Sequence, residues 1–160
     1  NRKSLSTQHP PERDRQFRFI KKVKRCFMNA GCPVISVDTK KKEQLGLFKN
    51  AGHTWSKSPQ EVNDHDFPRD AVGKAVPYGI YDLTHNKGYV YVGCSADTAE
   101  FAVDAITHWW KTDKEVFPCE DKLLILCDSG GSDSYRSRLW KQQLQEKLAD
   151  DLGIEVMVCH

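Results

Sequence analysis

Two short apolar runs that each end in an aspartate constrain this fold more than any other feature of the sequence. Val34–Asp38 reads VISVD and Lys122–Asp128 reads KLLILCD. Continuous apolar runs of this length are typical of strands that are buried on both faces, as in parallel sheets covered by helices. A chain of 160 residues can bury enough surface for one core, so we expect a single α/β domain.

The other elements follow from residue spacing. Apolar residues at three- and four-residue intervals predict helices, and two β-rich runs around a turn with Asn and Gly predict a hairpin. We expect helices over Glu12–Ala30, from Asp97 to about Lys111 and over Ser134–Asp151, hairpin strands over Tyr78–Leu83 and Tyr89–Gly93, and a last strand over Ile154–Cys159. The polar stretch Lys40–Val76 is predicted to be irregular, with room for an edge strand near Leu45–Lys49. This element order predicts a mixed sheet flanked by helices.

The charge distribution divides the chain into two parts. Net charge is only +2, yet ten basic residues and two acidic ones lie between Arg13 and Lys42. Such a segment can neutralise phosphates, although a solvated helix face explains it equally well. We expect residues 1–33 to be a linker and a basic amphipathic helix, and residues 34–160 to be the core. No apolar run is long enough to cross a bilayer, which argues against a membrane protein.

Asp38 and Asp128 are the candidate functional pair. If their two strands are neighbours, both carboxylates meet at one sheet edge, where close like charges are costly unless a cation holds them. Oxygen ligands favour Mg²⁺ or Mn²⁺, which can activate attacking and leaving oxygens in phosphodiester chemistry. The alternative is that each aspartate is a strand-end turn residue or a cap.

Other polar residues carry weaker signals. Asp97 and Glu100 form a D-x-x-E pattern that predicts a helix cap, with Asp97 accepting from the N–H of Glu100. The functional alternative is that Glu100 points to the metal site. Arg136 and Lys141 could contact phosphates or be solvated, and His65 in the long loop is a weaker substrate candidate. The six cysteines lack metal-binding spacing, which predicts free thiols and a reducing, cytoplasmic location.

Several motifs together resemble one family, the Rhodopirellula-type transposase DDE domain of bacterial insertion sequences. The resemblance begins at VISVDTKKKE, from Val34 to Glu43, and extends over nearly the whole chain. It continues through FKNAG (48–52), HDFP (65–68), YGIYD (78–82), TAEFAV (98–103), residues 123–131 and RLWK (138–141). It implies an RNase H-like fold in which Asp38 and Asp128 are the first two metal-binding acids.

The resemblance also implies an activity: Mg²⁺-dependent cleavage of transposon-end DNA, followed by strand transfer to target DNA. Lys40, Lys41 and Lys42 would then lie near phosphates, and the intact protein could form a homo-oligomer. The family carries a third carboxylate on a helix after the last strand, and no residue before His160 is assigned to it. We therefore expect a core that is incomplete at its C-terminus. Two alternatives stay open: an inactive DNA-binding or oligomerising remnant, and an RNase H-like nuclease that uses Asp38, Glu100 and Asp128.

Overall fold

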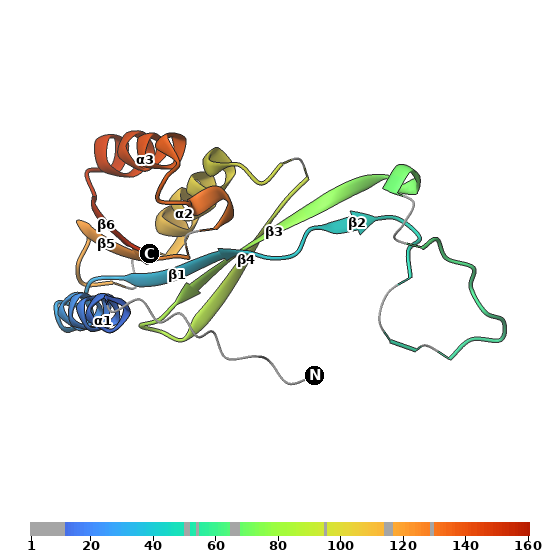
Figure 1. The fold of residues 1–160 in the computed structure, drawn as a ribbon, viewed down its shortest axis with the longest axis horizontal. Coiled ribbons are helices and arrows are strands. Elements are labelled where there is room, and N and C mark those ends of the chain that lie inside the picture. Colours follow the sequence, from blue (N-terminus) through green and yellow to red (C-terminus); the bar gives the residue numbers. More distant parts are fainter. Residues whose placement is uncertain are drawn as a thin grey trace.

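A computed structural model describes residues 12–49, 52–53, 55–64, 68–94, 96–113, 117–128 and 130–160 of the chain. Its strands and helices follow one another along the sequence much as the spacing predicts (Figure 1). In chain order they are α1 (Arg13–Asn29), β1 (Val34–Thr39), β2 (Glu43–Leu45), β3 (Gly73–Asp82), β4 (Lys87–Gly93), α2 (Ala99–Asp113), β5 (Lys122–Leu126), α3 (Arg138–Leu144) and β6 (Glu155–Cys159).

The strands form one mixed sheet, as predicted. Its order is β4-β3-β1-β5-β6, with β2 pairing beside the far end of β3. β1, β5 and β6 run parallel, while β3 is antiparallel to both β1 and β4. Asn86 lies in the turn between β3 and β4 with φ of 57°, the left-handed conformation that the hairpin signature requires.

A one-residue bulge separates β1 from β2 along their common neighbour β3. Thr39 pairs with Tyr78 and Glu43 with Ala75, so four residue steps on one side face three on the other. The amide of Lys40 still donates to the carbonyl of Pro77 at 2.8 Å. Bulges redirect side chains next to functional sites, and this one lies directly after Asp38.

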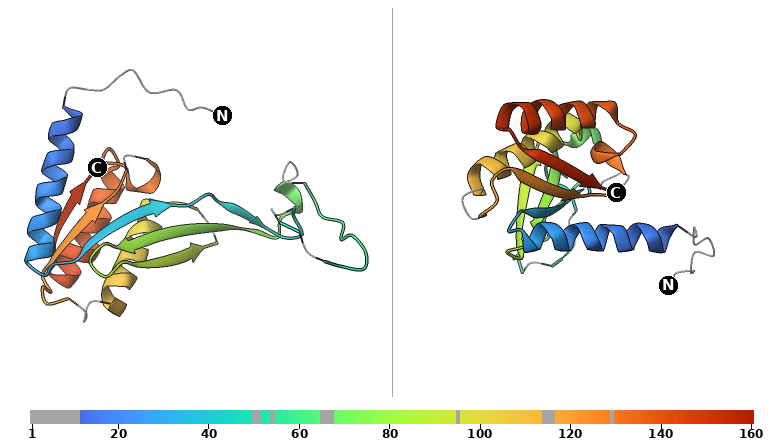
Figure 2. Two further views of the ribbon diagram at one scale, coloured as in Figure 1. Left: turned by 90° about the horizontal axis from the view of Figure 1, so that it is seen from below. Right: turned by 90° about the vertical axis from the view of Figure 1, so that its left-hand side faces the viewer.

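The two faces of the sheet are covered differently (Figure 2). α2 and α3 pack on one face, where Ile35, Ile125 and Trp109 belong to the main core. α1 lies on the opposite face, over a smaller cluster around Val34 and Leu124. Side chains alternate between the two faces along a strand. In β1 and β5 the even-numbered residues therefore face α1, and the odd-numbered residues face α2 and α3.

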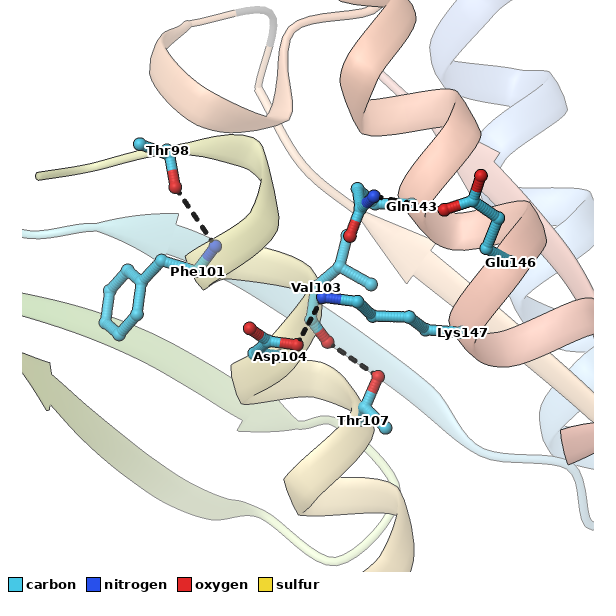
Figure 3. A network of polar contacts seen from close by, with 8 residues as sticks. All are labelled: Thr98, Phe101, Val103, Asp104, Thr107, Gln143, Glu146 and Lys147. Carbon is cyan, nitrogen blue, oxygen red and sulfur yellow. Dashed lines mark hydrogen bonds and ion pairs between the residues drawn. The ribbon is translucent and has the colours of Figure 1, made fainter. Parts of the chain in front are cut away.

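The cap of α2 differs from the prediction. The hydroxyl of Thr98 accepts the hydrogen bond from the amide of Phe101 at 3.2 Å (Figure 3). Asp97 is therefore not the cap, and the predicted bond from the amide of Glu100 is not formed. Thr98 is the N-cap because it directly precedes Ala99, the first residue of α2. The Asp97 carboxylate is therefore available for contacts outside the helix.

α3 begins later than predicted, at Arg138, because Ser137 caps it by accepting from the amide of Trp140 at 3.1 Å. Its continuation Gln145–Asp150 is a π-helix. An ion pair of 2.6 Å between Lys147 and Asp104 links this segment to α2 (Figure 3). Three of the four tryptophans, Trp109, Trp110 and Trp140, are buried in the core, whereas Trp55 is fully exposed.

β2 and the first half of β3 project from the body of the molecule as an arm (Figure 1). β3 begins at Gly73 and β2 ends at Leu45, so the strand predicted near Leu45–Lys49 is shifted towards the N-terminus. β3 is longer than the predicted strand Tyr78–Leu83, because it begins at Gly73 within the stretch predicted to be irregular. In the described part of the chain no helix is both long and apolar enough to cross a membrane.

The prediction that all six cysteines are free thiols is wrong. Cys32 and Cys119 form a disulfide, with their Cα atoms 4.7 Å apart. It joins the end of α1 to the segment before β5, where the Cys119 amide also donates to the Gly31 carbonyl at 3.3 Å. The 87-residue separation hid this pair, because spacing alone does not reveal which distant segments the sheet brings together.

Reduction of this disulfide should destabilise the protein. A cross-link that spans 87 residues is expected to contribute about 4.6 kcal/mol through the entropy of the unfolded chain. We predict that a reducing agent lowers the midpoint of thermal unfolding, and that Cys119→Ser has the same effect without reductant. Cys94→Ser is the control, because Cys94 is an exposed free thiol whose replacement should leave the midpoint unchanged. A reductant that does not shift the midpoint would contradict the prediction.

Candidate functional site

The register of the parallel strands brings Asp38 and Asp128 together. Ser36 pairs with Leu126, and Asp38 and Asp128 each lie two residues beyond that pair, with Asp128 just past the end of β5. Both aspartates therefore lie at the same edge of the sheet, where they line one cleft. The sequence prediction required β1 and β5 to be neighbours, and they are.

Both aspartates lie on the α1 side of the sheet. Asp38 has the same parity as Val34, which packs in the cluster under α1. Asp128 lines a surface cavity together with Arg13 and Phe17 of α1. The pair also borders a cleft of about 500 Å³ at the sheet edge. The cleft is lined by Asp38, Thr39, Lys40, Lys41, Lys42, Asp97, Asp128, Gly130, Gly131 and Asp133.

Each of the two carboxylates already has a partner in the cleft. The ammonium group of Lys40 lies 2.8 Å from Oδ2 of Asp38. Oδ1 of Asp128 accepts from the amide of Gly130 at 2.8 Å, so Asp128 also forms the strand-end turn considered as its alternative role. One oxygen of each carboxylate is outside these contacts, and both side chains are exposed.

Asp97 is a cleft residue that the sequence reasoning assigned to a helix cap. Its Oδ1 accepts from the hydroxyl of Thr39 at 3.1 Å, and its Oδ2 lies 3.7 Å from Nζ of Lys42. The D-x-x-E pattern concealed this position, because a capping motif explains an aspartate at a helix start without reference to a site. The carboxylate is nearly buried, with a side-chain exposure of 10%.

Asp133 is the second cleft acid that sequence reasoning missed. It is 2% exposed, and the hydroxyl of Ser132 donates to its Oδ1 at 2.7 Å. Burial raises the pKa of Asp133, the Ser132 hydrogen bond opposes this, and the charges of Asp128 and Asp97 add to it. Burial and then the charge of Asp133 also raise the pKa of Tyr78, a buried side chain of β3. Four carboxylates thus converge on one cleft.

The structure separates the other predicted residues. Glu100 is exposed on α2, which covers the opposite face of the sheet from Asp38 and Asp128, and it does not line the cleft. Arg136 lies at the same edge as the pair, because its neighbour Tyr135 contacts the ring of His160. Lys141 lines a different cavity, between α3 and β6. His65 lies outside the described residues.

His160 connects this edge to α1. Its Nδ1 lies 3.1 Å from the carbonyl of Asp128 and 3.3 Å from Sγ of Cys127. Its carbonyl accepts from Nε2 of Gln16 at 2.8 Å. The first turns of α1 are therefore anchored beside the aspartate pair.

The donor set of the cleft consists of carboxylate and hydroxyl oxygens with lysine ammonium groups. Within the described residues no three His, Cys, Asp or Glu side chains are grouped closely enough to form a complete metal site. The adjacent Asp38 and Asp128 nevertheless provide hard oxygen ligands, and Lys40 shows that one of them already attracts a cation.

Asp133→Asn should stabilise the protein at neutral pH. A carboxyl whose pKa is raised on folding binds its proton more tightly in the folded state, so stability falls as pH rises through its titration. The amide cannot ionise but can still accept from Ser132. We predict a higher unfolding midpoint for the variant at pH 7, with the difference shrinking at about pH 3 to 4, where an ordinary Asp titrates. Asp64→Asn, an exposed change, is the control; a destabilised Asp133→Asn at pH 7 would contradict the argument.

Cys127 should react slowly with alkylating agents in the folded protein. Burial, followed by the charges of Asp133 and Asp128, raises the pKa of its thiol to about 12. The reactive thiolate is then scarce at about pH 8, close to where an ordinary thiol is half ionised. Mass spectrometry after timed alkylation should find Cys26 and Cys94, both exposed, modified well before Cys127. Equal rates for the three would show that the site edge is open around Cys127.

Comparisons with known proteins agree with this architecture. The family model described as "Rhodopirellula transposase DDE domain" matches residues 1–160. No curated protein matches the chain. Among solved structures, the Mos1 transposase paired-end complex with left transposon end has a TM-score of 0.51 at 11% identity, covering 99% of this chain and 45% of that chain.

The Mos1 mariner paired end complex with Mn has a TM-score of 0.50 at 12% identity, covering 98% of this chain and 45% of that one. At such identities the likeness concerns the fold, which is the RNase H-like arrangement expected from the sequence. The chain spans slightly less than half the length of these two transposase chains.

Proposed function

The chain belongs to the Rhodopirellula transposase DDE domain family, and from this membership we propose that it is a metal-dependent DNA strand-cleaving and strand-transfer core. The observation that carries the proposal is the position of Asp38 and Asp128 at the same edge of two adjacent parallel strands, where both line one cleft. Two carboxylates placed this way suit phosphodiester chemistry, which needs a cation beside the reacting phosphate.

Asp38 and Asp128 fit Mg²⁺ or Mn²⁺ because they offer oxygen ligands on one face of the sheet. The bound cation would act as a Lewis acid and lower the pKa of a coordinated water. Asp97 and Asp133 line the same cleft and are the nearest further acids for charge compensation. The hydroxyl of Ser132 donates to Asp133 and that of Thr39 donates to Asp97, so each of these carboxylates is hydrogen-bonded within the cleft.

The lysines of the bulge would position the DNA backbone. Lys40, Lys41 and Lys42 line the cleft, and the contacts of Lys40 with Asp38 and of Lys42 with Asp97 bring ammonium groups to the acids. A cation held by Asp38 would compete with Lys40, which would then be free to contact a phosphate oxygen. Arg136 extends positive charge along the same edge. DNA as the partner is also in keeping with the transposon end named for the Mos1 complex.

The two alternative functions differ in what they require of the cleft. An RNase H-like nuclease that uses Glu100 is disfavoured, because Glu100 lies outside the cleft. An inactive DNA-binding or oligomerising remnant would bind duplex DNA with no cleavage at any divalent metal. Homo-oligomer formation by the intact protein belongs to the proposal and has no bearing on the metal pair.

Asp38→Asn and Asp128→Asn should each weaken Mn²⁺ binding, measured by the electron paramagnetic resonance of free Mn²⁺. Each change removes one of the two carboxylates of the pair, so we expect Mn²⁺ affinity to fall about 10-fold or more. A loss of that size is common even when the changed residue only hydrogen-bonds to a metal ligand. Both changes should also abolish Mn²⁺-dependent nicking of supercoiled DNA.

Glu61→Gln is the matched control, because Glu61 is an exposed acid between β2 and β3 that does not line the cleft. It should leave Mn²⁺ affinity and nicking unchanged. Undiminished Mn²⁺ binding in both Asn variants would reject the metal pair, whereas binding of Mn²⁺ and DNA without nicking would favour the inactive remnant.

A further inference from the structure

Among the helices and strands of the described structure, α1 carries the most basic residues. Seven of the 24 Lys and Arg residues of the chain lie on this helix, against one of its 22 Asp and Glu residues, Asp14. The remainder of the chain therefore has 17 basic and 21 acidic residues, which makes it net negative. The weak overall charge conceals this concentration.

The basic side chains of α1 share one side of the helix. Positions 15, 18, 22 and 25 recur at three- and four-residue spacing, which aligns them on a helix, and Lys21 lies beside them. All five of these side chains are exposed. Within the described residues none of them has an ion-pair partner, so their charge is open to an external anion.

The opposite side of α1 is occupied by the sheet. Ile20, Val23, Phe27 and Met28 are half-buried against the cluster formed by Val34, Leu124 and Cys159. A membrane-surface helix needs its apolar face for the lipid, and here that face is already used in folding. The arrangement therefore suits a polyanion that lies across the charged face without insertion.

The position of α1 relative to the Asp38–Asp128 cleft indicates that this polyanion is DNA. α1 lies on the same face of the sheet as Asp38 and Asp128, and its first turns are tied to that edge by the Gln16–His160 hydrogen bond of 2.8 Å (Figure 2). From Arg15 to Arg25 the basic face is about 15 Å long at about 1.5 Å per residue. At about 3.4 Å of axial rise per nucleotide in one strand, that length corresponds to about four phosphates.

We propose that the outer face of α1 is a second DNA-binding surface, which holds the backbone of duplex DNA adjoining the segment in the Asp38–Asp128 cleft. This inference rests on the proposed function for the identity of the DNA in the cleft, but backbone binding by α1 does not require cleavage. The contacts are to phosphates and carry no base specificity. The surface fixes the direction in which the DNA leaves the site.

The test is the salt dependence of duplex binding by the 160-residue chain, measured by fluorescence anisotropy with a random-sequence duplex several turns long. The variant Arg18→Gln/Arg25→Gln removes two charges from the face. Its matched control is Lys87→Gln/Lys111→Gln, which removes two exposed charges from β4 and the end of α2. Circular dichroism shows whether each variant keeps the fold.

We expect the α1 variant to bind more weakly and to have a shallower slope of log affinity against log salt. The slope should decrease by about 0.9 for each phosphate that the variant no longer neutralises, which is about 2 for the two arginines. The control should keep the wild-type slope. Equal slopes for the two double variants would overturn the proposal, as would sedimentation of the chain with phosphatidylserine vesicles and no duplex binding.

The aspartate variants separate this inference from the proposed function. Asp38→Asn/Asp128→Asn should lose nicking, and adding Arg18→Gln/Arg25→Gln to this variant should still lower the salt slope by about 2, because backbone binding by α1 does not require cleavage. If the wild-type chain fails to nick DNA while Arg18→Gln/Arg25→Gln still lowers the slope, the proposed function fails and the α1 surface stands. If nicking depends on Asp38 and Asp128 but Arg18→Gln/Arg25→Gln leaves the salt slope unchanged, the proposed function stands and the α1 surface fails.

Discussion

The parallel pairing of β1 with β5 is the interaction on which the rest of this structure depends. It places the 34–38 run beside the 122–128 run, so that Asp38 and Asp128 line the same cleft at one edge of the sheet. The burial of Ile35, Leu124 and Ile125 makes this pairing energetically favourable, because apolar side chains on both faces of the two strands are removed from water. The geometry of the site is therefore a consequence of core packing.

The same pairing distributes function between the two faces of the sheet. Even-numbered residues of β1 and β5, such as Asp38, face α1, while odd-numbered residues, such as Thr39, face α2 and α3. The aspartate pair consequently shares a face with the basic helix, whereas Asp97 and Asp133 approach the cleft from the other side. Positive and negative groups converge at one edge, and Lys40 and Lys42 lie between them.

The bulge after β1 and the arm that follows it are the second feature that shapes the cleft. β1 and β2 would be one continuous strand along β3 without the extra residue between Thr39 and Glu43. Lys40, Lys41 and Lys42 of this bulge line the cleft, and the arm leaves the body directly after them (Figure 1). Residues 1–33 as a separate basic segment and 34–160 as a core remain a proposal. α1 nonetheless packs on the sheet and, through Cys32–Cys119, is covalently tied to it.

The sequence by itself determined the strands other than β2 and the first half of β3, the hairpin, the mixed sheet and the position of Asp38 and Asp128 at strand ends. These features depend on local periodicity and on acids that directly follow apolar runs. Only the tertiary structure decided that Asp97 serves the cleft while Thr98 caps α2, that Asp133 is buried beside it, and that Glu100 lies outside it. The disulfide also required tertiary contacts, because its cysteines are 87 residues apart. Such roles depend on which distant segments meet, and short-range spacing does not encode that.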